Sequence, residues 1–383
     1  MARTIVVAIL VVAALPAAFR AARQTRRAAF QVPPAVKITG TPEMTAHFLP
    51  PTRTHFVHGA SIAELPDGDL LAAWYGGSDE VRADVNIYCS RQDHRTGGWS
   101  VPRILETRQG SEDAMRIRVK SIGNPVLFAD GRGVALFYVA VLYGGWSGGT
   151  ICMKTSADGE RWALPKRIVT SPFLNVGMLV RSKPWRYDDG SIVLPVYHEL
   201  LRKWSALVRI DARGRVVDER RVSDGRPLVQ PWLIPTGEQS AVTLLRWSSR
   251  MPGSVTVTRS GDGGRRWTDV FGTRLVQRDS AVAGIRLADG SLLAAYNNSA
   301  WDRRDLSLAR SADDGLHWSK PSPVERDTTP DNMVRREYSY PYFLQTRDGR
   351  YHLVYTWQRK LIRHVVFNDA WVLDDPLLAN PRG

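Results

Sequence analysis

Residues 156–162 read Ser-Ala-Asp-Gly-Glu-Arg-Trp, and this short pattern recurs along the chain. It returns as Ser-Gly-Asp-Gly-Gly-Arg-Arg-Trp at residues 260–267 and as Ser-Ala-Asp-Asp-Gly-Leu-His-Trp at residues 311–318, while a looser copy spans residues 90–99. Asp and Ser side chains bond the backbone of a tight turn, Gly supplies a positive φ, and a Trp ring fills the gap beside the next strand. We therefore expect the aspartates to hold turns rather than to catalyse a reaction. The repetition predicts a closed ring of β-units.

A second repeat consists of two apolar strands joined by a tight turn. Asp-Gly between apolar strands is the strongest short-range signal for a β-hairpin. Six such turns follow one another at intervals of 47 to 63 residues, which suits blades of four strands each. The turns are Asp67-Gly68, Asp130-Gly131, Asp189-Gly190, Thr236-Gly237, Asp289-Gly290 and Asp348-Gly349.

These repeats predict an all-β fold, a six-bladed β-propeller of four-stranded antiparallel blades over residues 35–375. Because each blade packs mainly against its neighbours, the ring has to close on itself. We expect residues from about 35 to 57, or a C-terminal strand around Val365, to complete the last blade. No segment shows the sustained periodicity of a helix.

The net charge indicates anionic partners. Lys and Arg number 52 against 38 Asp and Glu, an excess of 14, and the charges are spread along the whole chain. No nucleic-acid-binding motif is present, so we expect an acidic glycan or polysaccharide rather than a nucleic acid. A generally basic surface is the alternative explanation. The two cysteines, Cys89 and Cys152, exclude a disulfide scaffold, and we expect both to be buried free thiols. Neither has metal-ligand spacing with histidines, and we expect no metal or other cofactor.

The first 30 residues differ from the rest of the chain. Arg3 precedes an apolar run over residues 5–19, which is short for a membrane span and has the size of a signal-peptide core. We therefore expect a secreted or periplasmic protein. Four arginines follow the run within residues 20–27, a charge bias that opposes translocation of the next segment, so an uncleaved membrane anchor is the alternative.

In a propeller the first strand of every blade lines the central axis, and the loops that enter these strands form a funnel at one face. The polar residues just upstream of the six apolar strands are the candidates for a site: His58, Lys120, Asn124, Lys183, Gln230, Asp279, Ser280, Tyr338 and Tyr340. This set is rich in cations, amides and phenols and poor in carboxylates. Such a pocket suits a substrate that carries its own negative charge.

The first repeat resembles the Asp-box of the sialidase (neuraminidase) superfamily, and the resemblance to this superfamily covers nearly the whole chain after about residue 45. It implies three arginines that grip the substrate carboxylate, a Tyr nucleophile, a Glu that removes its proton and an Asp acid/base on a mobile loop. Arg246 and Arg303 look like the second and third arginines. The Tyr-Ser dipeptide favours Tyr338 as the nucleophile, whereas the spacing to the next turn favours Tyr340.

Two positions depart from the family's pattern. His58 stands where the first arginine is expected, and Gln230 stands where the Glu would activate the tyrosine, although an amide cannot accept that proton. Glu199 or Glu337 would have to substitute for it. The mobile-loop acid falls within residues 76–84, where Glu80 and Asp79 are better placed than Asp84.

Three hypotheses follow from these residues. The first is an exported exo-sialidase-like glycoside hydrolase that removes a terminal acidic sugar, with Tyr338 or Tyr340 attacking. The second is a lyase or a different hydrolase of an acidic polysaccharide, in which His58 is acid/base together with Tyr340. Asn124, Lys183 and Arg246 would then neutralise a uronate. The third is a non-catalytic propeller that binds glycan or protein.

Overall fold

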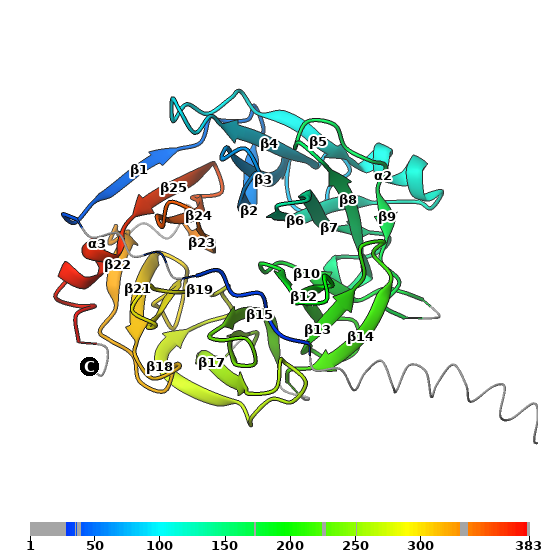
Figure 1. Cartoon of the computed structure of the whole chain (residues 1–383). Helices are drawn as coiled ribbons and strands as arrows, with labels where there is room; N and C mark the ends of the chain where they lie inside the picture. The colour runs from blue at the N-terminus through cyan, green and yellow to red at the C-terminus, as the bar shows by residue number, and fades with distance from the viewer. Residues whose placement is uncertain are drawn as a thin grey trace, which may run out of the picture.

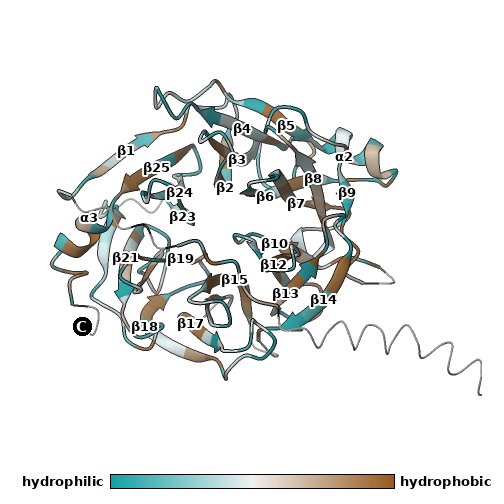
Figure 2. Cartoon of the chain, viewed as in Figure 1, coloured by the Kyte–Doolittle hydropathy of each residue, from teal (hydrophilic) through white to brown (hydrophobic). Residues whose placement is uncertain are grey.

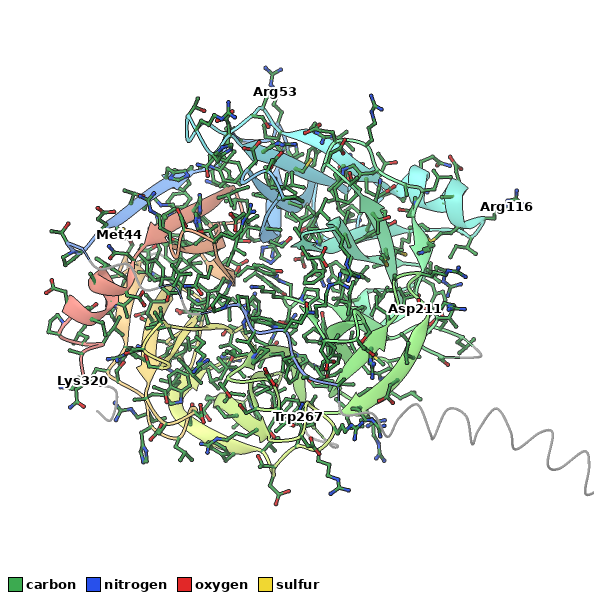
Figure 3. The ribbon with its side chains drawn as sticks, viewed as in Figure 1. Met44, Arg53, Arg116, Asp211, Trp267 and Lys320 are labelled. Atoms are coloured by element: carbon green, nitrogen blue, oxygen red, sulfur yellow. The ribbon has the colours of Figure 1, made fainter. Side chains whose placement is uncertain are left out.

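The computed structural model describes residues 28–34, 36, 40–171, 174–223, 227–249, 251–329 and 336–380. Six small antiparallel sheets stand around a central axis as blades, which confirms the predicted six-bladed β-propeller (Figure 1). Polar residues gather on the connecting loops and hydrophobic residues lie along the strands (Figure 2). Side chains fill the interior of the ring, with Arg53 and Arg116 at its outer edge (Figure 3).

In each blade the strands follow one another from the axis outward. The first contains β2 (Phe56–Glu64), β3 (Leu70–Gly77), β4 (Asn86–Gln92) and β5 (Arg103–Thr107). The second contains β6 (Ser121–Asp130), β7 (Gly133–Val141), β8 (Gly149–Ser156) and β9 (Lys166–Arg167). The third has an interrupted inner strand, β10 (Met178–Val180) and β11 (Trp185–Arg186), followed by β12 (Ile192–His198), β13 (Trp204–Ile210) and β14 (Val216–Arg221).

The last three blades follow the same order. The fourth contains β15 (Leu228–Pro235), β16 (Ala241–Trp247), β17 (Gly253–Ser260) and β18 (Phe271–Gln277). The fifth contains β19 (Ala283–Arg286), β20 (Leu292–Asn297), β21 (Asp305–Ser311) and β22 (Ser322–Arg326). The sixth contains β23 (Tyr338–Gln345), β24 (Tyr351–Trp357), β25 (Leu361–Phe367) and, outermost, β1 (Met44–Phe48). All six predicted hairpin turns join the inner strand of a blade to the second strand.

The Asp-boxes form the turns between third and fourth strands, as their chemistry predicts. Asp158 Oδ1 accepts hydrogen bonds from the backbone N–H groups of Glu160 at 2.8 Å and Arg161 at 3.0 Å. The indole of Trp162 donates to the carbonyl of Gly159 at 3.0 Å. Gly159 has a φ of 79°, and a Cβ there would lie 3.1 Å from Leu65 of the preceding blade. The turn therefore also packs one blade against the next.

Strand β1 closes the ring by pairing with β25, so both predicted contributors complete the last blade. A chain of three histidines crosses this seam: the half-buried His47 and the buried His364 and His352. His364 Nδ1 lies 3.0 Å from His47 Nε2, and His364 Nε2 lies 2.9 Å from His352 Nδ1. The indole of Trp99, from the first blade, donates to His47 Nε2 at 3.1 Å. The histidine chain therefore joins the closing strand β1 to the rest of the sixth blade, and the Trp99 contact joins it to the first blade.

Two short helices, α2 (Arg108–Met115) and α3 (Asp369–Asp374), were not apparent in the sequence. Helix α2 is too brief to show periodicity, but Thr107 caps it by accepting a hydrogen bond from the Gly110 N–H at 2.8 Å. Cys89 and Cys152 are buried and free, as expected. Burial raises the pKa of the Cys89 thiol to about 11, which makes it a packing group rather than a nucleophile.

The predicted leader or anchor within residues 1–30 lies outside the described residues, except for residues 28–30. From there the chain crosses one end of the ring (Figure 1), where Phe30 pairs with Tyr187 and its N–H donates to the carbonyl of Glu238 at 2.8 Å. In the part of the chain that the structure describes, no helix has the length and apolar character needed to cross a membrane.

Candidate functional site

The inner strands of four blades carry a β-bulge at the same level. The strand register shifts after His58, Gly123, Val229 and Ser339. The left-handed residues at these bulges are Gly59, Asn124, Gln230 and Tyr340, with φ of 62°, 49°, 51° and 57°. A bulge re-aims a side chain, and non-glycine residues adopt this conformation only where the surroundings enforce it. The bulges aim Asn124, Gln230 and Tyr340 into one cavity on the axis.

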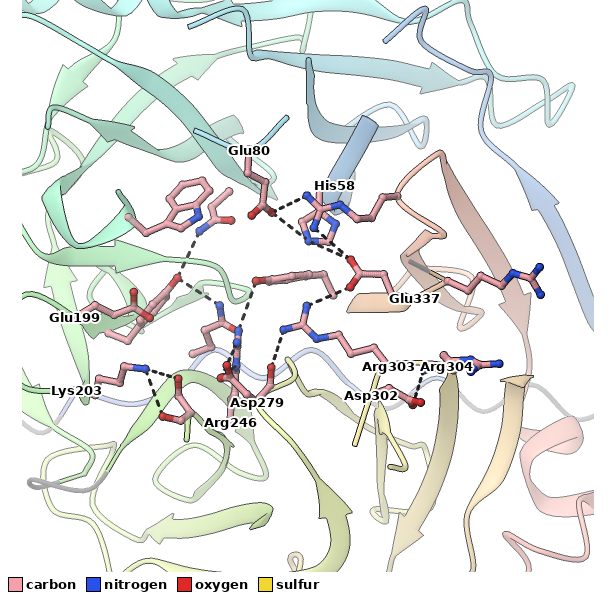
Figure 4. Close-up of a pocket in the computed structure, with 18 residues that line it drawn as sticks. His58, Glu80, Glu199, Lys203, Arg246, Asp279, Asp302, Arg303, Arg304 and Glu337 are labelled. Atoms are coloured by element: carbon pink, nitrogen blue, oxygen red, sulfur yellow. Dashed lines mark hydrogen bonds and ion pairs between the residues drawn. The ribbon is translucent and has the colours of Figure 1, made fainter. Parts of the chain in front are cut away.

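This cavity has a volume of about 700 Å³ and is the candidate active site (Figure 4). Its cationic lining residues are Lys203, Arg246, Arg303, Arg304, Arg336 and Arg359. Its carboxylates are Glu80, Glu199, Asp279, Asp302 and Glu337. The expectation of a pocket poor in carboxylates was therefore wrong, because most of these acids come from rim loops rather than from the entry to an inner strand. The positive charge exceeds the negative charge by only one when histidine is neutral.

Tyr340 lies in the cavity and Tyr338 does not. The Tyr340 hydroxyl is 3.5 Å from Arg246 Nη1, and its ring packs edge-on against His58 with the centroids 4.5 Å apart. The Tyr338 side chain is buried against Trp357, and burial raises the pKa of its phenol. Of the two predicted tyrosines, only Tyr340 is placed to meet a ligand in the cavity.

Arg246 and Arg303 are brought together through Asp279. Arg246 Nε and Nη2 donate to Asp279 Oδ1 at 3.1 and 2.8 Å, and Arg246 Nη1 donates to Gln230 Oε1 at 2.9 Å. Arg303 Nη2 donates to the Asp279 carbonyl at 2.6 Å, and its Nη1 is 3.7 Å from Glu337 Oε2. These contacts hold two guanidinium groups side by side in the cavity, a geometry suited to a carboxylate.

His58 is 1% exposed and occupies the position expected for a first arginine. Its Nε2 is 3.4 Å from Glu80 Oε1 and 3.9 Å from Glu337 Oε1. Burial, and then the positive charges of four arginines with Arg359 the foremost, lower its pKa well below the ordinary value. His58 is therefore a neutral imidazole at neutral pH.

Arg359 is a cation beside His58 that the sequence analysis missed. It lies in the turn between β24 and β25, with a φ of 57°. Arg359 Nη2 is 3.5 Å from Glu80 Oε1, and its Nη1 is 3.6 Å from Glu337 Oε1. It thus brings positive charge to the side of the cavity where the family's first arginine is absent.

Glu80 and Asp79 are separated by the structure. Glu80 lines the cavity and accepts a hydrogen bond from the Tyr75 hydroxyl at 3.0 Å. The Asp79 side chain is 62% exposed, is 3.7 Å from Arg359 and does not line the cavity. Asp84 accepts hydrogen bonds from the backbone N–H and the hydroxyl of Ser78, both at 2.9 Å, and so braces the loop.

Asn124 and Gln230 flank the cavity as predicted, and their amides each lie 3.4 Å from the Tyr197 hydroxyl. Lys183 does not belong to this site, which corrects the prediction. It lines a second cavity, of about 630 Å³, at the opposite end of the inner strands, with its Nζ 4.6 Å from the centroid of the Trp185 ring. The inner strand of the third blade is interrupted between Val180 and Trp185, so spacing from the turn misplaces Lys183.

A candidate cation-binding group among the described residues consists of Asp69, Asp93 and His94, whose ligand atoms lie within 4.8 Å of one another. None of the three lines the axial cavity. Asp69 already accepts a hydrogen bond from Arg91 Nε at 2.6 Å and contacts His94 Nδ1 at 2.7 Å. These contacts account for the group as part of the first blade's Asp-box turn.

The Asp-box ring and its axial pocket define a sialidase-like β-propeller. Residues 68–353 match the model of the BNR repeat-like domain, and the chain belongs to this family. Curated proteins give no match to the chain.

Three solved structures illustrate the fold. The Hadza microbial sialidase Hz136 shares 15% identity at a TM-score of 0.64, with 82% of this chain and 66% of that chain covered. A protein of unknown function from Dyadobacter fermentans shares 13% identity at a TM-score of 0.65, with 88% and 100% covered. The NanB sialidase from Streptococcus pneumoniae shares 12% identity at a TM-score of 0.64, with 87% and 71% covered. At this identity the likeness establishes the fold and leaves the activity open.

Proposed function

We propose that this protein is an exported sialidase-like glycoside hydrolase that removes a terminal acidic sugar from glycans. The observation that carries the proposal is the convergence of Tyr340, Arg246 and Arg303 in one cavity. The sialidases among the structural neighbours support the same chemistry. The apolar run of residues 5–19 supports export.

In the proposed reaction Arg246 and Arg303 hold the substrate carboxylate, and the Tyr340 oxygen attacks the anomeric carbon. A neutral phenol suits this task, because a carboxylate on the sugar repels an anionic nucleophile; sialidases with a Tyr nucleophile are exceptions to the two-carboxylate scheme. The Arg246 guanidinium at the Tyr340 hydroxyl stabilises the negative charge that develops on its oxygen. Glu80 protonates the leaving oxygen, oriented by its hydrogen bond from Tyr75.

Two carboxylates, Glu199 and Glu337, are the candidates for removing the proton of Tyr340. Among the described residues, no carboxylate lies within hydrogen-bond distance of the Tyr340 hydroxyl, but both acids line the cavity. Burial raises the pKa of Glu199 despite the opposing charge of Arg246, and a higher pKa makes a carboxylate a better proton acceptor. Glu337 is held by Arg303 and Arg359 instead.

The deciding experiment measures release of 4-methylumbelliferone from its glycoside with N-acetylneuraminic acid. We expect Tyr340→Phe to lower kcat at least about 1000-fold, since the nucleophile is removed. Tyr338→Phe is the matched control and should change kcat less than about threefold. Loss of activity in Tyr338→Phe together with full activity in Tyr340→Phe would refute the assignment.

A second candidate function is β-elimination from a uronate-containing polysaccharide. The observation that favours it is the contact between the neutral imidazole of His58 and the Tyr340 ring, which pairs a base with a phenol in the same cavity. In this reaction Asn124 and Arg246 would neutralise the uronate, without Lys183. Ultraviolet absorbance of an unsaturated uronate would support this reaction. Saturable glycan binding with neither product would indicate a binding protein.

A further inference from the structure

We propose that Arg181 is a positioning residue that crosses the axis of the propeller and fixes Tyr340 in its attacking orientation. This inference rests on the proposed role of Tyr340. Arg181 follows the short inner strand β10 of the third blade, which lies across the ring from the sixth (Figure 1). Its Nη2 donates a hydrogen bond to the backbone carbonyl of Tyr340 at 2.8 Å. The two residues are 159 positions apart in the sequence, and the contact joins opposite sides of the ring.

The backbone at Tyr340 needs such a partner. Residues 340 and 341 bulge out of the pairing between β23 and β24, whose register shifts between Ser339 and Tyr342. Tyr340 has a φ of 57°, a conformation that a bulky residue rarely adopts. A carbonyl released from a β-ladder requires another hydrogen-bond donor when it is buried. Arg181 supplies that donor and so favours the backbone conformation that aims the phenol into the cavity.

The guanidinium of Arg181 also contacts the aromatic rings on both sides of the bulge. Its central carbon is 5.1 Å from the centroid of the Tyr340 ring and 5.6 Å from that of Tyr342. Tyr342 is itself fixed, because its hydroxyl donates to the Leu127 carbonyl at 3.2 Å and its ring packs edge-on against Trp232. One rigid planar cation therefore touches the nucleophile's ring, its carbonyl and the anchored residue next in line.

A purely structural role does not account for Arg181. It is 2% exposed, and no carboxylate of the described residues lies within 4.0 Å of it. Its Nε and Nη1 have no hydrogen-bond partner among the described residues. A buried cation without a counter-ion is destabilising, and an apolar side chain of similar length would fill the same space at lower cost. Arg181 is also not among the residues that line the cavity, so it does not contact the substrate. Its effect should therefore appear in kcat rather than in KM.

The first test compares Arg181→Met with Arg181→Lys, using 4-methylumbelliferyl N-acetylneuraminic acid as substrate. We expect Arg181→Met to lower kcat about 100-fold while KM stays within about threefold, the effect of misplacing a reacting group by about 1 Å. Arg181→Lys keeps a cationic donor and should recover part of kcat. Arg310→Met is the matched control, because Arg310 is a buried arginine of the fifth blade held by Asp289 and Ser291. It should lower the melting temperature and leave kcat unchanged.

The second test does not depend on turnover. 3-Fluorotyrosine placed at position 340 gives a fluorine NMR resonance that reports the surroundings of the ring. Arg181→Met should shift or split this resonance, whereas a label at position 338 should not respond. If Arg181→Met does not fold, Arg181→Lys is used for both tests. It should move the resonance by a small amount from its wild-type position and give a kcat below that of wild type.

Unchanged kcat and an unchanged resonance in folded variants would overturn the positioning role, as would equal losses of kcat in Arg181→Met and Arg310→Met. A wild-type protein without turnover would refute the proposed hydrolase instead. In that case the fluorine resonance still decides whether Arg181 fixes Tyr340.

Discussion

Acidification should weaken the seam where the propeller closes, through the histidine chain of His47, His364 and His352. Burial lowers the pKa of His352 to about 4, with Asp348 opposing the change and Arg350 adding to it. Burial also lowers the pKa of His47, and it lowers that of His364 well below the ordinary value of 6.5. The folded protein therefore holds the chain neutral over a range of pH in which the unfolded protein takes up protons.

The sign and the size of the effect follow from this difference in pKa. Above about pH 6.5 His352 is largely neutral in both the folded and the unfolded protein, and the free energy of unfolding has its full value. As the pH falls from 6.5 towards 4, His352 binds a proton in the unfolded protein but not in the folded protein, so the free energy of unfolding falls. For His352 alone, with pKa values of 6.5 unfolded and about 4 folded, the loss at pH 4.5 is about 2 to 3 kcal/mol. This is a large part of the free energy of unfolding of an ordinary domain.

Urea unfolding followed by tryptophan fluorescence, at pH 7 and at pH 4.5, measures this loss. His352→Phe keeps a ring stacked on His364 but removes the titrating group. The variant should be less stable at pH 7, by about 1 to 2 kcal/mol, because His364 Nε2 loses its partner. Between pH 7 and pH 4.5 it should then lose about 2 to 3 kcal/mol less than wild type does.

His55→Gln, at an exposed position, is the control and should follow wild type at both values of pH. Because wild type and variant share every other titrating group, the difference between their losses reports the titration of His352 together with its coupling to His364. Equal losses of stability in wild type and His352→Phe would show that His352 is not held neutral in the folded protein.

Three further predictions concern the pocket and its opposite cavity. Arg303→Met should raise KM for the fluorogenic sialoside about 10- to 100-fold, because a charge-assisted hydrogen bond to the substrate carboxylate is lost; an unchanged KM would remove Arg303 from the clamp. Glu80→Gln should lower kcat about 100-fold or more on a natural sialyl-oligosaccharide and much less on the activated fluorogenic substrate, and Asp79→Asn should change neither rate, measured by free sialic acid release. Lys183→Met should leave kcat and KM unchanged, because Lys183 lies in the other cavity; a loss of activity with intact folding would reject that separation.

The fold was predictable because its signals are local. Each Asp-box and each Asp-Gly turn is specified within a few residues, and the number of turns fixes the number of blades. The same reasoning found His58, Asn124 and Gln230, since equivalent positions of successive repeats meet on one axis. Arg246 was found through the resemblance to the sialidase superfamily, and it lines the same cavity. It also predicted that the Asp-box aspartates hold turns, and the hydrogen bonds of Asp158 confirm this.

Prediction failed where one blade departs from the repeat or where a long side chain reaches across the axis. The interrupted inner strand of the third blade moves Lys183 to the wrong end and places Arg181 beneath the pocket, which no count of residues from a turn can show. Arg359 was missed because it enters from an outer hairpin. One signal was available: Asn124, Gln230 and Tyr340 each precede a proline and share the bulge, whereas Tyr338 does not. This shared dipeptide distinguishes the two tyrosines.

The balance of charge in the pocket limits the kind of anion it can bind. Arg246, Arg303 and Arg359 already contact Asp279, Glu337 and Glu80, so an incoming carboxylate has to share these guanidinium groups with acids of the protein. An unpaired cluster of arginines would attract any polyanion, but a cluster compensated to within one charge gains most from a single carboxylate set between two guanidinium groups. Each further negative group on a ligand would face the five acids of the lining, and the described lining residues hold only one cation in excess to offset them. We therefore expect the pocket to bind a sugar with one carboxylate at the chain end better than the repeated charges of a sulfated or polyuronic chain.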